Sequence, residues 1–212
     1  MTRYDFTTQP NRLDQNTMKW HEAESNPELL ELWVADMDFL PVPEIRDAVI
    51  NYAETHIFGY PYPSEELYQS IINWEKNQHG YAVDKESIVL IEGVVPAIST
   101  AIQAFTKEGD AVLINTPVYP PFARSVRLNN RRLIENSLVK VNGHFEIDFE
   151  QLERDIVDNE VKLYVFCSPH NPGGRVWTKE ELTKVADLCQ KHGVLLVSDE
   201  IHQDLALYGN KH

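Results

Sequence analysis

The chain has 212 residues, of which 42% are hydrophobic and 25% are charged. This composition is typical of a folded globular protein, and the length suffices for one or two domains with a sizeable core. The 33 acidic residues outnumber the 19 basic residues, so the formal net charge is -14. Because this charge repels a phosphate backbone, we expect no nucleic-acid partner.

The cysteines and the first residues bear on the cellular compartment. Cys167 and Cys189 each lie in an apolar pattern, without the paired spacing of a zinc site or a disulfide framework. Two buried thiols fit a reducing cytosol. Residues 1–10 lack the basic start and the apolar run of a signal peptide, and no stretch approaches the roughly 18 apolar residues of a membrane span. We expect a cytoplasmic protein with no membrane contact and no bound metal.

The first segment predicts an arm. Residues 1–43 are irregular and rich in Asn, Asp, Glu and Trp, and a short apolar island, Leu32 to Val34, runs into the acidic stretch Asp36 to Asp38. Prolines then punctuate the chain before the first helical pattern. We therefore place a boundary after residue 43 and expect a larger body over residues 44–212.

The next elements are two helices separated by a loop. Apolar residues recur at helical spacing over residues 44–56, which predicts a helix. The proline-rich residues 58–63 exclude helix and predict an ordered loop. Ser64 is a typical N-cap, and Gly80 a typical end, for a second helix.

Strands and helices alternate in the remainder of the chain. Short apolar runs predict strands, and a capping box from Thr178 to Glu181 opens the last helix. This order implies a three-layer α/β/α fold with a mostly parallel sheet. The expected strands are residues 88–91, 111–114, 133–139, 163–167 and 194–197, and a further helix is expected over residues 96–105.

Ligands of such sheets bind beyond the carboxyl ends of the strands, and the unusual residues of this chain fall there. The turn from Ser168 to Gly174 follows one strand, and by itself it indicates only a tight turn. The next strand delivers Asp199, with His202 three residues later. The amide of Asn171 and two further polar side chains are therefore expected to converge in one crevice. The loops beginning at Gly93 and Thr116 are expected to line it too.

These residues give the chain a family resemblance. It resembles the fold-type I enzymes dependent on pyridoxal 5'-phosphate (PLP), in which a strand ending in Asn-Pro-x-Gly is followed by a helix and a strand ending in an aspartate. Within this class I/II aminotransferase superfamily it is most similar to the cystathionine β-lyase branch of the MalY and PatB type. The resemblance covers essentially all 212 residues and implies the PLP-binding large domain, with a portion of the small domain in the arm. The matching pieces are WVADMDF (33–39), FGYP (58–61), GVVP (93–96), TPVYPP (116–121) and DEIH (199–202).

The resemblance implies cofactor contacts residue by residue. Asp199 faces the pyridine nitrogen of PLP and keeps it protonated, so that the ring can accept the electrons of a carbanion. Asn171 and His202 bind the phenolic oxygen, although many relatives carry a tyrosine in place of the histidine. Tyr119 stacks on the ring. The plainer interpretations are a solvated strand-end acid, a tight turn, a bystander histidine and a core tyrosine.

Two further pieces concern the phosphate of PLP. Gly93, Val94 and Val95 precede a helix, where free N–H groups and the helix dipole favour an anion, and in the family this loop holds the phosphate. Tyr60 resembles the tyrosine that reaches the phosphate from the neighbouring subunit, which implies a homodimer with shared active sites. Without the resemblance, the glycine indicates a turn and Tyr60 an ordinary loop residue. The stretch Asp36–Met37 resembles the arm that borders the substrate.

Family members hold PLP through a lysine that lies a few tens of residues beyond the aspartate. Lys211 is only twelve positions after Asp199, too close for the chain to return to the ring. We therefore expect no Schiff-base lysine, and no catalytic residue, within these residues. The chain is expected to be the N-terminal part of such an enzyme and inactive by itself.

The resemblance implies a C–S β-lyase that forms pyruvate, ammonia and a thiol from an S-substituted cysteine. A PLP-dependent aminotransferase is the alternative, because both reactions begin with the same carbanion. A non-catalytic regulatory or binding module is the alternative from another class. The DEIH motif also resembles that of helicase-type ATPases, but these need a Gly-Lys phosphate loop, and the chain contains no Gly-Lys pair.

Overall fold

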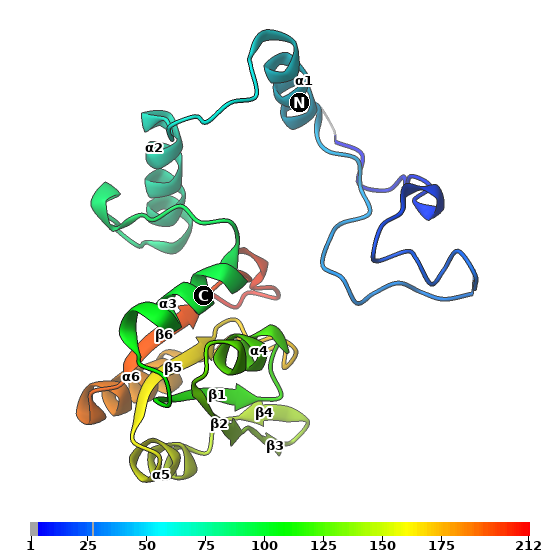
Figure 1. The fold of residues 1–212 in the computed structure, drawn as a ribbon. Coiled ribbons are helices and arrows are strands. Elements are labelled where there is room, and N and C mark those ends of the chain that lie inside the picture. The colour runs from blue at the N-terminus through cyan, green and yellow to red at the C-terminus, as the bar shows by residue number, and fades with distance from the viewer. Residues whose placement is uncertain (1–3, 27) are drawn as a thin grey trace. The chain divides into compact units, whose positions relative to one another are not determined.

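The computed structural model describes residues 4–26 and 28–212, so residues 1–3 and 27 of the predicted arm lie outside the described residues. The chain divides into two compact units, one ending at Pro63 and the other running from Ser64 to His212 (Figure 1). This division falls later than the boundary predicted after residue 43. The predicted boundary separates domains of the whole protein, and it stays a prediction. No helix of the described residues is long and apolar enough to cross a bilayer.

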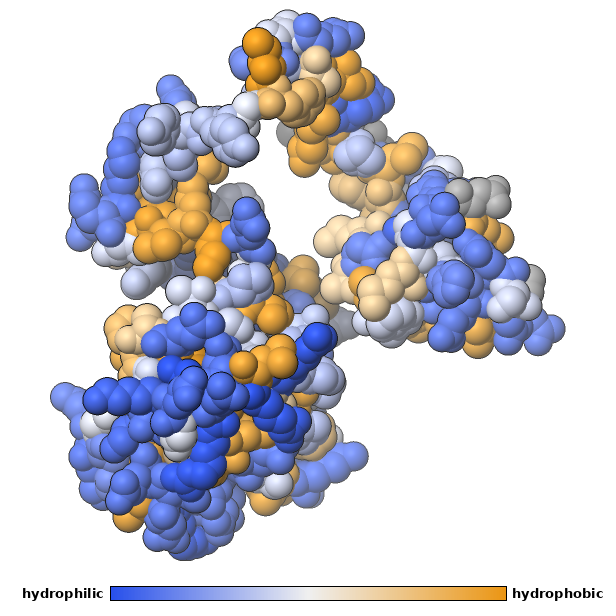
Figure 2. Space-filling view, in the orientation of Figure 1, coloured by the Kyte–Doolittle hydropathy of each residue, from blue (hydrophilic) through white to orange (hydrophobic). Residues whose placement is uncertain are grey.

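The first unit contains a short 3-10 helix, Leu13–Gln15, and the helix α1, Pro43–Thr55, which confirms the predicted helix. The proline opens α1, where its missing N–H has no helical partner to lose. None of the residues of α1 is buried, and apolar side chains stay exposed along it (Figure 2). The unit therefore has little apolar core.

Polar contacts organise the arm instead. The Asp38 carboxylate accepts hydrogen bonds from Arg12, Lys19 and Trp20, at 2.5, 2.8 and 3.0 Å. The ammonium group of Lys19 also donates to the Asp36 carbonyl at 2.8 Å. One carboxylate thus joins segments of the arm that are far apart in sequence.

The second unit is built on a four-stranded sheet in the order β2-β1-β5-β6, in which every neighbouring pair is parallel. This confirms the predicted mostly parallel sheet. The strands are β1 (Ala111–Thr116), β2 (Arg132–Ser137), β5 (Val161–Cys167) and β6 (Leu195–Asp199), and an antiparallel hairpin is formed by β3 (Val139–Val141) and β4 (His144–Glu146).

Helices cover both faces of this sheet. On one face Ile102 of α3 and Phe122 of α4 pack with Val112 of β1. On the other face α5 and α6 pack on side chains that include Tyr164 of β5. The predicted three-layer α/β/α fold is therefore confirmed. The helices are α2 (Glu65–Trp74), continued by a π-turn (Glu75–His79), α3 (Val94–Phe105), α4 (Pro121–Leu128), α5 (Phe149–Asp158) and α6 (Lys179–His192), with 3-10 turns at Lys85–Ser87 and Gln203–Leu205.

Two strand predictions are wrong. The predicted strand over residues 133–139 ends at Ser137, because Asn142 and Gly143, both with positive φ, form a tight turn that folds the following residues into the β3–β4 hairpin. Residues 88–91 are not a strand, since none of the described residues pairs with them, and Val89 is 83% exposed. An apolar run favours a strand, but a strand also needs a hydrogen-bonding neighbour.

Candidate functional site

The carboxyl ends of the parallel strands lie at one edge of the sheet, and backbone hydrogen bonds join the loops that leave them. The Tyr119 N–H, in the loop after β1, donates to the Asn171 carbonyl at 3.2 Å. The Ser168 N–H, at the end of β5, donates to the Asp199 carbonyl at 2.9 Å. Three of the four predicted loops are thus directly connected at this edge.

The turn that carries Asn171 is fixed by its neighbour His170. The Gly174 N–H donates to the His170 carbonyl at 2.8 Å, and the Gly173 N–H donates to the imidazole Nδ1 at 3.2 Å. A Cβ at Gly173 would lie 2.6 Å from that Nδ1, so only glycine fits beside the ring. The turn therefore holds Asn171 in a defined position.

His170 has no role predicted from the sequence, and it is 3% exposed in the structure. Burial, assisted by the charge of Arg175, lowers the pKa of His170 to about 4, so the ring is neutral at physiological pH. Because Nδ1 accepts a hydrogen bond, Nε2 carries the proton, and this buried atom has no partner among the described residues. The sequence carries no signal for this side-chain-to-backbone bond, because it depends on which ring nitrogen meets the Gly173 N–H in the folded turn.

Asp199 ends β6 and is 7% exposed. Its Oδ1 accepts a hydrogen bond from the Ile201 N–H at 3.0 Å. Burial raises the pKa of the Asp199 carboxyl above its ordinary value, against the lowering effects of the Ile201 N–H and of His202. No cationic side chain of the described residues forms an ion pair with this carboxyl. A buried acid in this condition is suited to binding a cationic hydrogen-bond donor.

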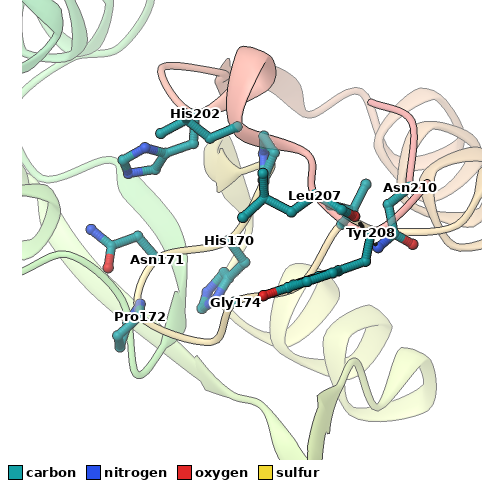
Figure 3. Close-up of a pocket in the computed structure, with 11 residues that line it drawn as sticks. His170, Asn171, Pro172, Gly174, His202, Leu207, Tyr208 and Asn210 are labelled. Atoms are coloured by element: carbon teal, nitrogen blue, oxygen red, sulfur yellow. Dashed lines mark hydrogen bonds between the residues drawn. The ribbon is translucent and has the colours of Figure 1, made fainter. Parts of the chain in front are cut away.

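Asn171 and His202 line a cavity of about 350 Å³, together with His170, Leu205 and Tyr208. Figure 3 shows the Asn171 amide and the His202 ring on the same side of the turn that carries Asn171. The structure thus brings these two predicted residues together. Neither Asp199 nor Tyr119 lines this cavity.

Tyr119 lies between β1 and α4, and its side chain remains 44% exposed. Its ring packs edge-on against Phe122, with centroids 6.4 Å apart and planes at 82°. The interpretation as a core tyrosine is therefore wrong, because the ring keeps an accessible face. Its backbone bond to Asn171 fixes its place at the sheet edge.

Helix α3 begins at Val94, two residues before the predicted start, because Gly93 forms the N-cap with φ of 109°. This backbone conformation favours glycine. Val94 and Val95 therefore lie in the first turn of α3, where N–H groups lack helical partners. Since α3 packs against β5 and β6 and ends shortly before β1 begins, its N-terminus faces the edge at which the strands end.

Tyr60 belongs to the first unit, in the loop that follows α1, and its side chain is fully exposed. Its predicted contact with phosphate is a contact with another subunit and stays a prediction. Of the predicted substrate-bordering pair, Asp36 forms an ion pair with Arg12 at 2.6 Å, and Met37 is exposed.

Comparison with known proteins defines the class. The chain belongs to the family described as Aminotransferase class I and II, which matches residues 27–211. It is 43% identical to cystathionine beta-lyase PatB of Bacillus subtilis (strain 168), over 98% of this chain and 54% of PatB. It is 35% identical to protein MalY of Escherichia coli (strain K12), over 84% of this chain and 46% of MalY.

The same assignment follows from a solved structure. Cystalysin from Treponema denticola, which contains a pyridoxal 5'-phosphate cofactor, superposes with a TM-score of 0.93 at 40% identity, over 100% of this chain and 55% of that one. The predicted family is therefore confirmed. The chain spans about half the length of the curated relatives it matches.

Proposed function

We propose that the protein containing this chain is a PLP-dependent C–S β-lyase, which releases pyruvate, ammonia and a thiol from an S-substituted cysteine. The observation that carries the proposal is the buried carboxyl of Asp199, with its single backbone hydrogen bond and raised pKa. A cationic N–H group placed against it would offset the cost of burying an unpaired charge. The protonated pyridine nitrogen of PLP is such a group.

The other residues of the site fit the remaining groups of PLP. The N–H groups of Val94 and Val95, at the glycine-capped start of α3, suit its phosphate. The Asn171 amide and the His202 ring, which share a cavity, suit its phenolic oxygen. The accessible ring of Tyr119 suits stacking. A PLP molecule held by these residues would supply an electron sink for the α-carbon of the substrate, which is the chemistry that β-elimination needs.

The residues of the chain bind and orient within this scheme. Asp199 keeps the proton on the pyridine nitrogen, because a buried carboxylate stabilises the cation that neutralises it. His170, through its bond to the Gly173 N–H, holds the turn so that the Asn171 amide stays at the cavity. The rigid sheet edge supplies the fixed geometry that such a site needs.

The assembly and setting belong to the same proposal. The substrate is a small amino acid, and the protein is a cytoplasmic homodimer in which Tyr60 reaches the phosphate held by the other subunit. The full exposure of Tyr60, next to the exposed Phe58 and Tyr62, supports a partner surface over this loop. Residues 1–43 form the arm and a portion of the small domain.

An aminotransferase is the second candidate, favoured by the description of the matching family. The two reactions differ in their products. The full-length gene product that contains this chain should be incubated with PLP and cystathionine, and pyruvate should be assayed. Stoichiometric pyruvate without an added keto acid supports the lyase. Amino-group transfer to a keto acid, with the carbon–sulfur bond intact, would instead establish the aminotransferase.

A further inference from the structure

A second polar cluster in the same unit joins the end of α2 to the residues that follow His202. The Asp204 carboxylate accepts hydrogen bonds from Trp74 Nε1, at 3.1 and 3.2 Å to its two oxygens. It also contacts His79 Nε2 at 2.8 Å. The neighbouring Gln203 donates from Nε2 to a carboxylate oxygen of Glu75 at 2.9 Å. Two adjacent residues thus attach one short turn to the end of α2.

The π-turn that continues α2 explains how its side chains reach Asp204. In a π-helix the hydrogen bonds join residues five apart, so side chains at that spacing come onto one side. Trp74 and His79 are five apart, and the π-turn spans Glu75–His79. A regular α-helix would bring together residues three or four apart instead. The irregular geometry therefore places both donors against a single carboxylate.

The attached turn is the 3-10 helix Gln203–Leu205, and His202 is its N-cap. The Leu205 N–H donates to the His202 carbonyl at 2.9 Å, and the Gln203 N–H donates to the Glu200 carbonyl at 2.9 Å. One turn of 3-10 helix has too few internal hydrogen bonds to hold its shape alone. Its attachment to α2 therefore fixes the residues that precede it.

We propose that Asp204 is a positioning residue for the cofactor site. By binding Trp74 and His79, it fixes the turn whose N-cap residue, His202, lines the same cavity as Asn171. This inference rests on the proposed function, because the fixed position of His202 matters for binding the phenolic oxygen of PLP.

The attachment itself can be tested without cofactor. In the cofactor-free full-length protein, Asp204→Ala should raise the amide hydrogen exchange of residues 200–206 by at least about tenfold, which corresponds to about 1.4 kcal/mol. Asp204→Asn should restore most of the protection, because its amide oxygen still accepts hydrogen bonds. The matched control is Glu153→Ala, which removes another carboxylate bridge, to Lys191 and to His192 at 2.7 and 2.8 Å, between α5 and α6. Unchanged exchange in Asp204→Ala would refute the attachment.

The positioning role is tested by a double-mutant cycle with PLP. Asp204→Ala should weaken PLP binding about tenfold and shift the pH midpoint of the absorption of bound PLP, whereas Glu153→Ala should change neither. In a His202→Ala background the same substitution should change the affinity less than twofold, because its target is gone. An equal loss of PLP affinity in both backgrounds would overturn the inference about Asp204. It would not affect the proposal that the protein binds PLP. A wild-type protein that binds no PLP would instead refute the proposed function, and the inference with it.

Discussion

The arm and the sheet edge each depend on one aspartate, and the two carboxyl groups meet opposite conditions. In the arm, hydrogen bonds from Lys19, then from Arg12 and Trp20, lower the pKa of Asp38 to about 2. At the sheet edge, burial raises the pKa of Asp199, which has one backbone donor. The first carboxylate is neutralised by its own chain, and the second is not.

This difference separates a structural acid from a binding acid. The carboxylate oxygens of Asp38 already accept hydrogen bonds from Arg12, Lys19 and Trp20. Few acceptor positions therefore remain for a ligand. Asp199 is fixed in its buried position because it ends strand β6. The free energy of burying its carboxyl is therefore not offset by a cationic partner within the described residues. Burial without a partner is therefore the property that marks the candidate site.

The largest expected effect concerns this unpaired charge. Asp199→Asn should weaken PLP binding by about 100-fold or more in the full-length protein, because removing one member of a buried charge pair costs several kcal/mol. The control is Glu200→Gln, an exposed acid next along the chain, which should change the affinity less than threefold. Absorbance titration with PLP measures both. Similar PLP affinities of the two variants would contradict the claim that the buried Asp199 carboxylate binds the cofactor.

A smaller effect is expected from the turn that holds Asn171. Gly173→Ala places a Cβ 2.6 Å from His170 Nδ1, so the turn must shift, and PLP affinity should fall about tenfold. Gly143→Ala, in the β3–β4 hairpin and away from the cavity, is the matched control. It adds strain of about 1 kcal/mol at a φ of +87° but meets nothing within 4 Å. It should lower the thermal stability slightly and leave the affinity unchanged. Equal affinity losses in both variants would show that the bond to His170 does not matter.

Substitution of Asp38 should change the stability of the arm rather than the affinity for PLP. Asp38→Asn should destabilise the arm by about 2 kcal/mol at neutral pH, seen as faster hydrogen exchange over residues 5–40. Because folding lowers the pKa of Asp38 to about 2, this contribution is present above the unfolded pKa of about 4 and is lost as the pH falls toward 2. The half-exposed Asp36, as Asp36→Asn, is the control and should cost less than about 1 kcal/mol. A difference that persists at pH 2 would contradict the assignment.

The smallest effect belongs to the neutral His170. Its pKa is lowered to about 4 in the fold, so its contribution to stability is present above pH 6.5 and is lost as the pH falls toward 4. His170→Gln should remove about 1–2 kcal/mol of this pH dependence, measured by urea unfolding at several pH values. The control for loss of an imidazole at an exposed position is His144→Gln. A wild-type stability that is flat between pH 7 and 4 would contradict the buried neutral ring.

Much of the fold could be predicted because burial leaves a periodic pattern in the sequence. The capping box of α6 and the apolar runs of β1 and β5 are local signals, and the structure places them as expected. The run at residues 88–91 carries the same apolar signal, but its pairing depends on a neighbour that local sequence does not identify. Helix α5 was missed because it is short and only Leu152 and Ile156 of its residues are buried.

The residues of the candidate site could also be predicted only as far as local sequence motifs identify them. Motifs indicated Asn171 and Asp199, since an Asn-Pro turn and a strand-end acid are visible as residue types. The raised pKa of Asp199 could not be predicted, because it comes from burial by distant segments. The role of His170 depends on which ring nitrogen meets the Gly173 N–H, and that follows from the folded turn. The types of the site residues could thus be predicted from the sequence, whereas their burial and their hydrogen bonds could not.

The most direct test of the central claim is the ionisation of Asp199 itself. Carbon-13 NMR of carboxyl-labelled aspartate, assigned with Asp199→Asn, reports its pKa in the full-length protein with and without PLP. We predict that the Asp199 pKa lies above the ordinary aspartate value in the cofactor-free protein and decreases strongly when PLP binds, with the Asp38 pKa about 2 in both states. An Asp199 pKa that does not change on addition of saturating PLP would contradict the claim that this carboxylate pairs with the cofactor.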